Sequence, residues 1–277
     1  MPGSALASLW SFACNAAMAG LAGFLAVDMV APPQHLPWTP LEIDRPVGAA
    51  TPIKIARFQP VPQPSLADAE FERCLAVLEQ AGVQVERVDP REEQGFCVIR
   101  NGVRITGGTT PLSPGGQPMA CPLAIRYAIW DRQALQPAAR EVLGAEVERV
   151  EVAGTYACRT VGNATGPEAR VSEHARANAL DVFSIRLGDG RTISVASDWG
   201  AIDPNSRAAR AAEQAILEAG GTPVRAEAPP EPGPEGRFLR RIRDEGCRIF
   251  GTVLSPEYNA AHRDHLHLDG STFSLCQ

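Results

Sequence analysis

The stretch HRDHLHLDG, residues 262–270, holds three of the five histidines of the chain within six positions. Successive side chains of a β-strand point to opposite faces. The run HLHLD therefore puts His265, His267 and Asp269 on one face and two leucines on the other. The leucine face suits a protein core and the histidine face suits a cleft, so the sequence predicts a half-buried strand that presents two imidazoles to one site.

A fourth histidine, His174, lies in the run SEHARANALD, seven residues before Asp181. On a continuous helix these two residues would be about 10.5 Å apart along the axis, too far for one metal ion to bridge. If His174 instead lies on a turn before a strand that carries Asp181, the two side chains can meet. The hairpin-like pattern after Asp181 favours this second geometry.

These residue types are ligands of zinc, which binds histidine nitrogen and carboxylate oxygen and, in catalytic sites, takes three protein ligands. His174, Asp181 and one histidine of the final pair would fill that set, and the other histidine would be left to move protons. The alternative is a hydrogen-bonded histidine cluster without metal, in the core or at a surface braced by disulfides.

Composition narrows the class of protein. With 277 residues and 44% apolar residues, the chain is long enough for one large domain or two small ones with a packed core. The formal net charge is −6 and there is no basic run, which argues against nucleic acid as a partner.

The N-terminal part has two segments of distinct composition. Residues 1–27 carry no charged side chain and are long enough to span a bilayer. We expect residues 1–30 to be a membrane anchor, with a cleaved signal peptide or a buried helix as alternatives. Residues 31–64 contain nine prolines and little periodicity, which predicts an extended tether.

The cysteines indicate the compartment. Cys14 lies in the expected anchor, no CxxC pair occurs, and six cysteines are dispersed through the rest of the chain. Behind a membrane-targeting segment this pattern predicts about three disulfides in an oxidising compartment. Free buried thiols in a cytosolic protein are the alternative, and fifteen pairings are possible for six cysteines. The disulfide candidates are Cys74, Cys97, Cys121, Cys158, Cys247 and Cys276.

Several local patterns predict helices. A helix capped by Ser65 should end at Gly82, a second should begin at Pro122 and run through Leu135, and a third should run from Pro137 to Gly144. A fourth is expected at residues 237–246.

Other patterns predict strands and loops. Asn101 and Gly102, between two strand-like runs, predict a hairpin turn. A strand is expected at residues 147–154, a hairpin at 179–197 and a surface loop at 226–236. Intermixed helices and antiparallel strands predict a single α+β domain over residues 65–277, in which a small antiparallel sheet carries the zinc site.

The segments GTYACRTVGN, SEHARANALDV and HRDHLHLD, with the six cysteine positions, resemble the bacterial extensin-like C-terminal domain family. The resemblance covers about residues 65–277. It relates the chain to zinc peptidases of the D-Ala-D-Ala carboxypeptidase and penicillin-insensitive murein endopeptidase type. Ala177 stands where the wider superfamily has glycine.

The resemblance implies roles for individual residues. His174, Asp181 and His267 would bind zinc. Because no glutamate stands close before His267, His265 is expected to act as the catalytic base, with Asp264 and His262 as weaker candidates. The segment GTYACR implies that Arg159 binds a substrate carboxylate; a surface ion pair is its alternative role.

The expected function is that of a zinc-dependent peptidase that cleaves D-amino-acid-containing bonds of peptidoglycan. It would be periplasmic, anchored in the inner membrane or exported, and its partners would be peptidoglycan stem peptides. A non-catalytic peptidoglycan-binding or scaffolding module with the same fold is the alternative. A third possibility is an extracellular, disulfide-rich interaction domain without metal.

Overall fold

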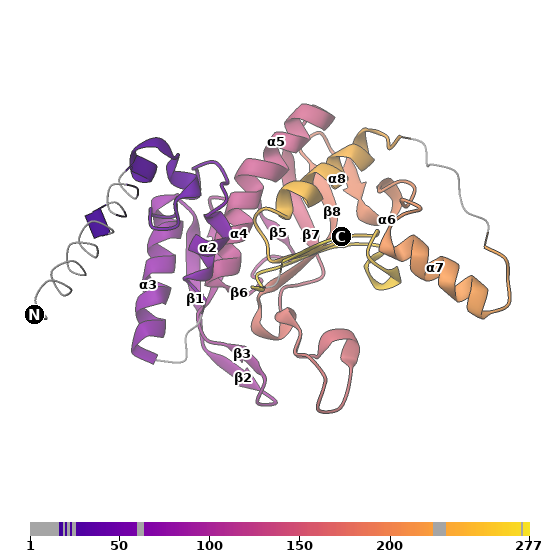
Figure 1. The fold of residues 1–277 in the computed structure, drawn as a ribbon, viewed down its shortest axis with the longest axis horizontal. Helices are drawn as coiled ribbons and strands as arrows, with labels where there is room; N and C mark the ends of the chain where they lie inside the picture. Colours follow the sequence, from indigo (N-terminus) through magenta and orange to yellow (C-terminus); the bar gives the residue numbers. More distant parts are fainter. Residues whose placement is uncertain are drawn as a thin grey trace, which may run out of the picture.

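The computed structural model describes most of the chain, and Figure 1 shows its arrangement. The described residues are 17, 18, 20, 23, 26–59, 64–223, 231–272 and 274–277. Within these ranges, no helix has both the length and the apolar character needed to cross a bilayer. Much of the anchor or signal segment expected at residues 1–30 lies outside the described residues.

The sheet that carries the histidine-rich stretch has the strand order β12-β10-β11-β8-β7-β5, and β9 pairs with β8. Its strands are antiparallel neighbours except for the parallel pairs β10/β12 and β5/β7. Two smaller sheets have the orders β1-β4-β6 and β2-β3. The strands are β1 Gln84–Val88, β2 Arg91–Glu93, β3 Cys97–Ile99, β4 Gly102–Gly107, β5 Leu112–Ser113, β6 Met119–Ala120, β7 Val147–Val152, β8 Ala179–Leu187, β9 Thr192–Ser194, β10 Thr252–Leu254, β11 Leu266–Asp269 and β12 Leu275–Cys276.

Helices and short helical turns accompany these sheets, so the domain is α+β as predicted. The α-helices are α2 Thr51–Ala56, α3 Pro64–Gln80, α4 Cys121–Trp130, α5 Gln136–Ala138, α6 Val195–Asp198, α7 Arg207–Glu218 and α8 Pro234–Gly246. The other helical segments are η1 Pro33–His35, η2 Asp131–Leu135, η3 Ala139–Leu143, η4 Val161–Asn163, η5 Glu173–Arg176 and η6 Ala260–His262. Figure 1 shows α7 at one extremity of the molecule, where none of its residues is buried.

The core lies between α4, α8 and the apolar side of the large sheet. Every residue of α4 is buried, and α8 buries Phe238, Leu239 and Ile242 in the same cluster. Gly246 at the end of α8 faces the side chains of both Trp130 and Leu268. The leucine side of β11 therefore packs on these helices, which leaves its histidine side for the candidate site.

The two helices predicted to begin at Pro122 and at Pro137 form one continuous helical segment. The backbone stays right-handed from α4 through η3 and ends at Gly144, which has a positive φ of 68°. The N–H of Gln136 bonds to the carbonyl of Asp131, five residues back. This wider turn accommodates Pro137 inside the helix, so the predicted break there is wrong.

The hairpin predicted at Asn101 and Gly102 is also wrong, because β3 pairs with β2 whereas β4 pairs with β1 and β6. The tight turn lies earlier, where Gln94 and Gly95 have φ values of 53° and 73°. A Cβ on Gly102 would come within 2.7 Å of the Ile99 side chain. Glycine at this position allows close packing rather than a turn.

Residues 31–59 pack on the domain instead of forming the predicted extended tether. Ile43 and Ile55 are buried in the main core cluster, which the proline content alone did not suggest. Lys54, also buried, donates from Nζ to the Pro33 carbonyl and the Thr39 hydroxyl, 2.9 and 2.7 Å away. The apolar side chains between the prolines therefore hold this segment against the helices.

The three disulfides join elements that are far apart in the sequence. Cys74 pairs with Cys121, Cys97 with Cys158, and Cys247 with Cys276. All six predicted candidates are therefore bonded, and α3 is fixed to α4, β3 to the segment before Arg159, and the end of α8 to β12.

Candidate functional site

The turn η5 places His174 beside the sheet. The hydroxyl of Ser172 accepts from the His174 N–H, 3.3 Å away, and Ala177 then takes a left-handed conformation with φ 52°. This reverses the chain into β8, where Asp181 is the third residue. His174 therefore precedes the strand on a turn, as the sequence suggested, rather than lying on a helix with Asp181.

The register between β8 and β11 brings the third residue of the cluster into place, because His267 lies directly opposite Asp181. His267 Nδ1 is 2.8 Å from Asp181 Oδ1, and His174 Nε2 is 3.1 Å from Asp181 Oδ2. One ligand atom from each of the three residues lies within 4.8 Å of the others. The predicted metal ligands are thus together on three elements.

The chemistry of this cluster fits a metal ion. His174 is 3% exposed, and its Nε2 makes no well-aligned hydrogen bond with any described residue, although Asp181 Oδ2 lies 3.1 Å away. A buried, unpaired imidazole nitrogen is costly unless another partner takes its lone pair. Two imidazole nitrogens and one carboxylate oxygen form a donor set suited to zinc.

Opposing effects set the charges of this cluster. Burial would raise the pKa of Asp181, but His174 and His267 outweigh burial and hold that pKa well below its usual range. For His267, burial lowers the pKa, whereas its contacts with Asp181 and Asp269 raise it to about 9. The metal-free site therefore carries a carboxylate next to a protonated imidazole, and a metal would replace the proton between them.

His265 lies beside the three predicted ligands. Its Nδ1 is 2.8 Å from Asp264 Oδ1, and its Nε2 is 3.7 Å from Asp181 Oδ1. The ring stacks on Phe183, with ring centres 5.2 Å apart. Since a carboxylate only accepts, Nδ1 of His265 carries the hydrogen that points to Asp264, and Nε2 faces Asp181 in the cluster. Asp264 therefore orients His265, and Phe183 is a contact that the sequence did not reveal.

His262 is a further member of the cluster, with ring centres 5.1 Å from His265 and 5.9 Å from His267. Its Nδ1 is 2.7 Å from Asn259 Oδ1, an oxygen that also accepts from a backbone N–H. Burial, with the neighbouring charges of His265 and His267, lowers the pKa of His262 to about 4. This ring is therefore neutral at neutral pH, and Asn259 holds it in place.

Arg159 follows Cys158 and is partly buried. Its charge acts on His262, so its side chain belongs to the surroundings of the cluster. In the described parts of the chain, no carboxylate lies within ion-pair distance of Arg159. The alternative role of a surface ion pair therefore finds no partner there, and the guanidinium can bind an anion.

Glu257 is the nearest glutamate before His267 in the sequence, and it is already engaged. Its carboxylate accepts from Trp199 Nε1 at 3.0 Å and from the Asp203 N–H at 3.0 Å. It also pairs with Arg240 at 2.8 Å. This buried network joins the loop before α7 to α8, so the carboxylate of Glu257 is already occupied by structural partners.

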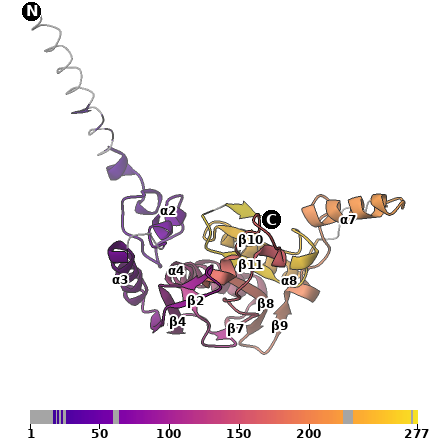
Figure 2. The same ribbon diagram turned by 90° about the horizontal axis from the view of Figure 1, so that it is seen from below.

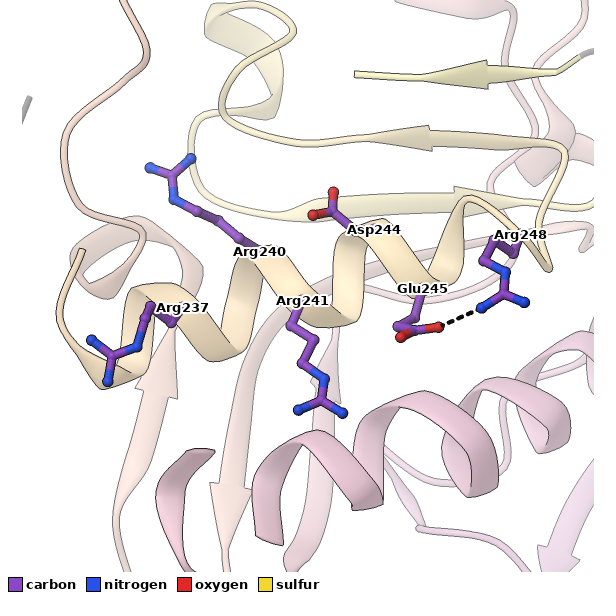
Figure 3. Close-up of a pocket in the computed structure, with 6 residues that line it drawn as sticks. All are labelled: Arg237, Arg240, Arg241, Asp244, Glu245 and Arg248. Atoms are coloured by element: carbon purple, nitrogen blue, oxygen red, sulfur yellow. Dashed lines mark hydrogen bonds and ion pairs between the residues drawn. The ribbon is translucent and has the colours of Figure 1, made fainter. Parts of the chain in front are cut away.

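Two of the hollows in the described surface lie near charged side chains and are lined by no histidine. One, of about 570 Å³, lies beside η5, with Glu173 and Arg176 in its wall. The other, of about 450 Å³, is lined by residues of α8 and by Arg248, which follows it, and Figure 3 shows Arg240 and Arg241 leaving the helix in different directions. These arginines pair with Glu257 and Glu141, so their charge is already compensated.

Comparison with known proteins identifies the family. The family model described as Extensin-like protein C-terminus matches residues 72–220 and 215–277. Neither the comparison with curated proteins nor that with solved structures gave a significant match. Together the two matched ranges span the cysteines that form the disulfides and the whole histidine cluster. Because they cover well over half of the chain, the protein belongs to the extensin-like C-terminal family.

Proposed function

We propose that this protein is a zinc-dependent peptidase that cleaves D-amino-acid-containing peptide bonds of peptidoglycan. The observation that carries the proposal is the cluster of His174, Asp181 and His267, whose ligand atoms lie within 4.8 Å of one another. His174 Nε2 is buried next to the Asp181 carboxylate and makes no well-aligned hydrogen bond with a described residue, which supports a metal between the two groups. The resemblance to zinc D-Ala-D-Ala carboxypeptidases and murein endopeptidases suggests the substrate.

Zinc held by these three residues would supply a Lewis acid that polarises a carbonyl group and lowers the pKa of water from 15.7 to about 7. The protein contributes the proton carrier. Asp264 holds Nδ1 of His265, so that Nε2 can take a proton from water and return it to the leaving amine. A positioned acid or base of this kind contributes about 10² to 10⁴ in rate.

Arg159 would bind the substrate. Its guanidinium has no carboxylate partner among the described residues and lies close enough to His262 to act on its charge. A guanidinium binds a carboxylate through two parallel hydrogen bonds, and peptidoglycan stem peptides offer carboxylates at several places. His262, on whose pKa the charge of Arg159 acts, is neutral and adds no second positive charge to this region. A carboxylate bound by Arg159 would hold the peptide near the cluster.

We place this activity in the periplasm, with residues 1–30 as an anchor in the inner membrane or as an export signal. Three disulfides support an oxidising compartment, because cytosolic thiols are kept reduced. The dispersed negative charge, −6 in total, supports a partner other than nucleic acid.

A second candidate is a module that binds peptidoglycan without turnover. It is favoured by the engagement of Glu257 with Arg240, which leaves the site without a free glutamate as base. Both candidates require the same fold and the same peptide ligand. They differ in whether His265 transfers protons, so measuring cleavage separates them.

The test uses the full oxidised chain, the variant His267→Ala and the control variant His35→Ala, which changes the one histidine outside the cluster. We expect about one zinc per chain in the wild type and the control, and none in His267→Ala. The zinc-loaded protein should cleave purified muropeptides, detected by mass spectrometry, and His265→Ala should keep zinc but lose cleavage. Folded wild type without zinc would refute the peptidase, and zinc with unchanged muropeptides would favour the binding module.

A further inference from the structure

The ring of His267 contacts a carboxylate on each of its two nitrogens. Nδ1 is 2.8 Å from Asp181, a predicted metal ligand, and Nε2 is 3.3 Å from Asp269 Oδ2. Asp269 ends β11, two residues after His267, and Figure 2 shows this strand beside β10 and β8. His267 is thus held from both sides within the sheet.

Asp269 is itself fixed in place. It is 6% exposed, and its Oδ1 accepts from the N–H groups of Thr252 and Ser271, at 3.1 and 2.9 Å. The buried guanidinium of Arg126, which donates to the Ile249 carbonyl, is close enough to interact with the charge of Asp269. With Oδ1 committed to the backbone, Oδ2 is directed at His267.

We propose that Asp269 is a positioning residue that fixes the tautomer and orientation of His267 for metal binding; this inference rests on the proposed function. An ionised carboxylate only accepts hydrogen bonds, so Nε2 of His267 carries the hydrogen that points to Asp269. A neutral imidazole has one N–H, which leaves the lone pair on Nδ1, directed at Asp181 and the metal position. Carboxylates behind metal-binding histidines act in this way and raise metal affinity.

In the neighbouring His265, a carboxylate contacts the other ring nitrogen. Asp264 contacts Nδ1 of His265, so that Nε2 faces Asp181, whereas Asp269 contacts Nε2 of His267, so that Nδ1 faces Asp181. Two carboxylates thus assign different nitrogens to two rings that lie two residues apart. One ring would bind metal and the other would carry protons.

This contrast provides the matched control for the test. The variant Asp269→Asn keeps a side-chain oxygen for the Thr252 and Ser271 N–H groups but presents an amide N–H to His267. The ring would then place its hydrogen on Nδ1, where it competes with the metal. Asp264→Asn makes the same chemical change next to a histidine outside the proposed ligand set.

The experiment measures zinc affinity by competition with a chromophoric chelator, after circular dichroism has confirmed folding of the metal-free proteins. We expect Asp269→Asn to bind zinc about 10- to 100-fold more weakly than wild type, and Asp264→Asn to bind within about threefold of it. Equal affinity of Asp269→Asn and wild type would overturn the role of Asp269 and leave the proposed function standing. A wild type that binds no zinc would overturn both.

A second measurement needs no substitution and covers the case in which Asp269→Asn does not fold. Nitrogen-15 NMR of the zinc-loaded wild type distinguishes a protonated ring nitrogen from a metal-bound one. We expect hydrogen on Nε2 of His267 and metal on Nδ1. The reverse assignment, or loss of hydrogen from both nitrogens, would overturn the inference even though zinc is bound.

Discussion

The disulfide between Cys97 and Cys158 should stabilise the domain and position Arg159, which follows Cys158 directly. Replacing both cysteines with alanine removes the only covalent link between the β2–β3 hairpin and this segment in the described part of the chain. The closed loop spans 61 residues. The chain-entropy relation for a loop of this length gives a loss of about 4 kcal/mol in the free energy of unfolding.

The bond between Cys247 and Cys276 provides the control, because it closes a loop of 29 residues. The same relation gives a loss smaller by about 0.7 kcal/mol for the shorter loop. Urea denaturation of both double-alanine variants measures these values. Zinc content should be unchanged in Cys97→Ala/Cys158→Ala, because the predicted ligands lie on η5, β8 and β11, whereas the KM for a peptide substrate should rise.

Two results would refute this reasoning. A loss below about 1 kcal/mol for the 61-residue loop would mean that unfolded-chain entropy does not govern its stability. A KM unchanged within error would show that the bond does not position Arg159. Loss of zinc together with substrate binding would instead indicate a disturbed cluster, contrary to the expected separation.

Three further outcomes are expected. The pKa of His267 is about 9 in the folded protein and 6.5 in an ordinary histidine. The protonated ring therefore contributes its full share to the free energy of unfolding below pH 6.5, and this contribution is lost as the pH rises through 9. In urea titrations, the free energy of unfolding of the metal-free wild type should fall by on the order of 3 kcal/mol across this pH range, and that of His267→Gln should not. The same pH dependence in both proteins would show that His267 is not the cause. Arg159→Lys should raise KM about tenfold with zinc content and kcat unchanged, because lysine cannot bind a carboxylate in the same bidentate way; a lower kcat at constant KM would argue against a binding role. Lys54→Met removes the ammonium donor from the Pro33 carbonyl and the Thr39 hydroxyl. The free energy of unfolding should fall by about 1 to 3 kcal/mol, and proteolysis before residue 64 should become faster. An unchanged rate of digestion would show that Lys54 does not hold this segment on the domain.

Local patterns predicted much of the fold because several elements are specified by their own residues. The leucine and histidine alternation in β11, the helix ending before Gly82 and the hairpin of β8 and β9 agree with the sequence. The placement of His174 on a turn followed from the spacing to Asp181, since only a turn and a strand bring residues seven apart to one point.

The errors arose where tertiary packing changed the role of a residue. Glycine is needed at position 102 because a Cβ there would collide with the Ile99 side chain, whereas the sequence pattern led us to predict a turn. Pro137 is accommodated by a widened turn in a helical segment that buries Ala134 and Leu135 in the core. The packing of Ile43 in the core depends on partners beyond residue 100, which no local window contains.

The sequence predicted that the residues of the candidate cluster lie together, but it did not predict their hydrogen bonds. Spacing placed Asp269 on the same face as His267, yet gave no indication that it contacts Nε2. The contribution of Asn259 to the cluster depends on the turn η6, and the engagement of Glu257 depends on Arg240 from α8. Such contacts join segments whose relative position is set by the whole fold.

The register of β8 and β11 has a consequence for folding. Asp181 and His267 are 86 residues apart in the chain. Strand β11 lies between β8 and β10 in the sheet, so it must pair with β8 after the long segment that separates them in the sequence. Pairing of such distant strands is slow compared with local structure. An intermediate in which β11 has not yet joined β8 would have one imidazole and one carboxylate of the cluster, too few ligands to retain the ion. If the proposed zinc site is correct, zinc capture during refolding would therefore report the pairing of β11 with β8.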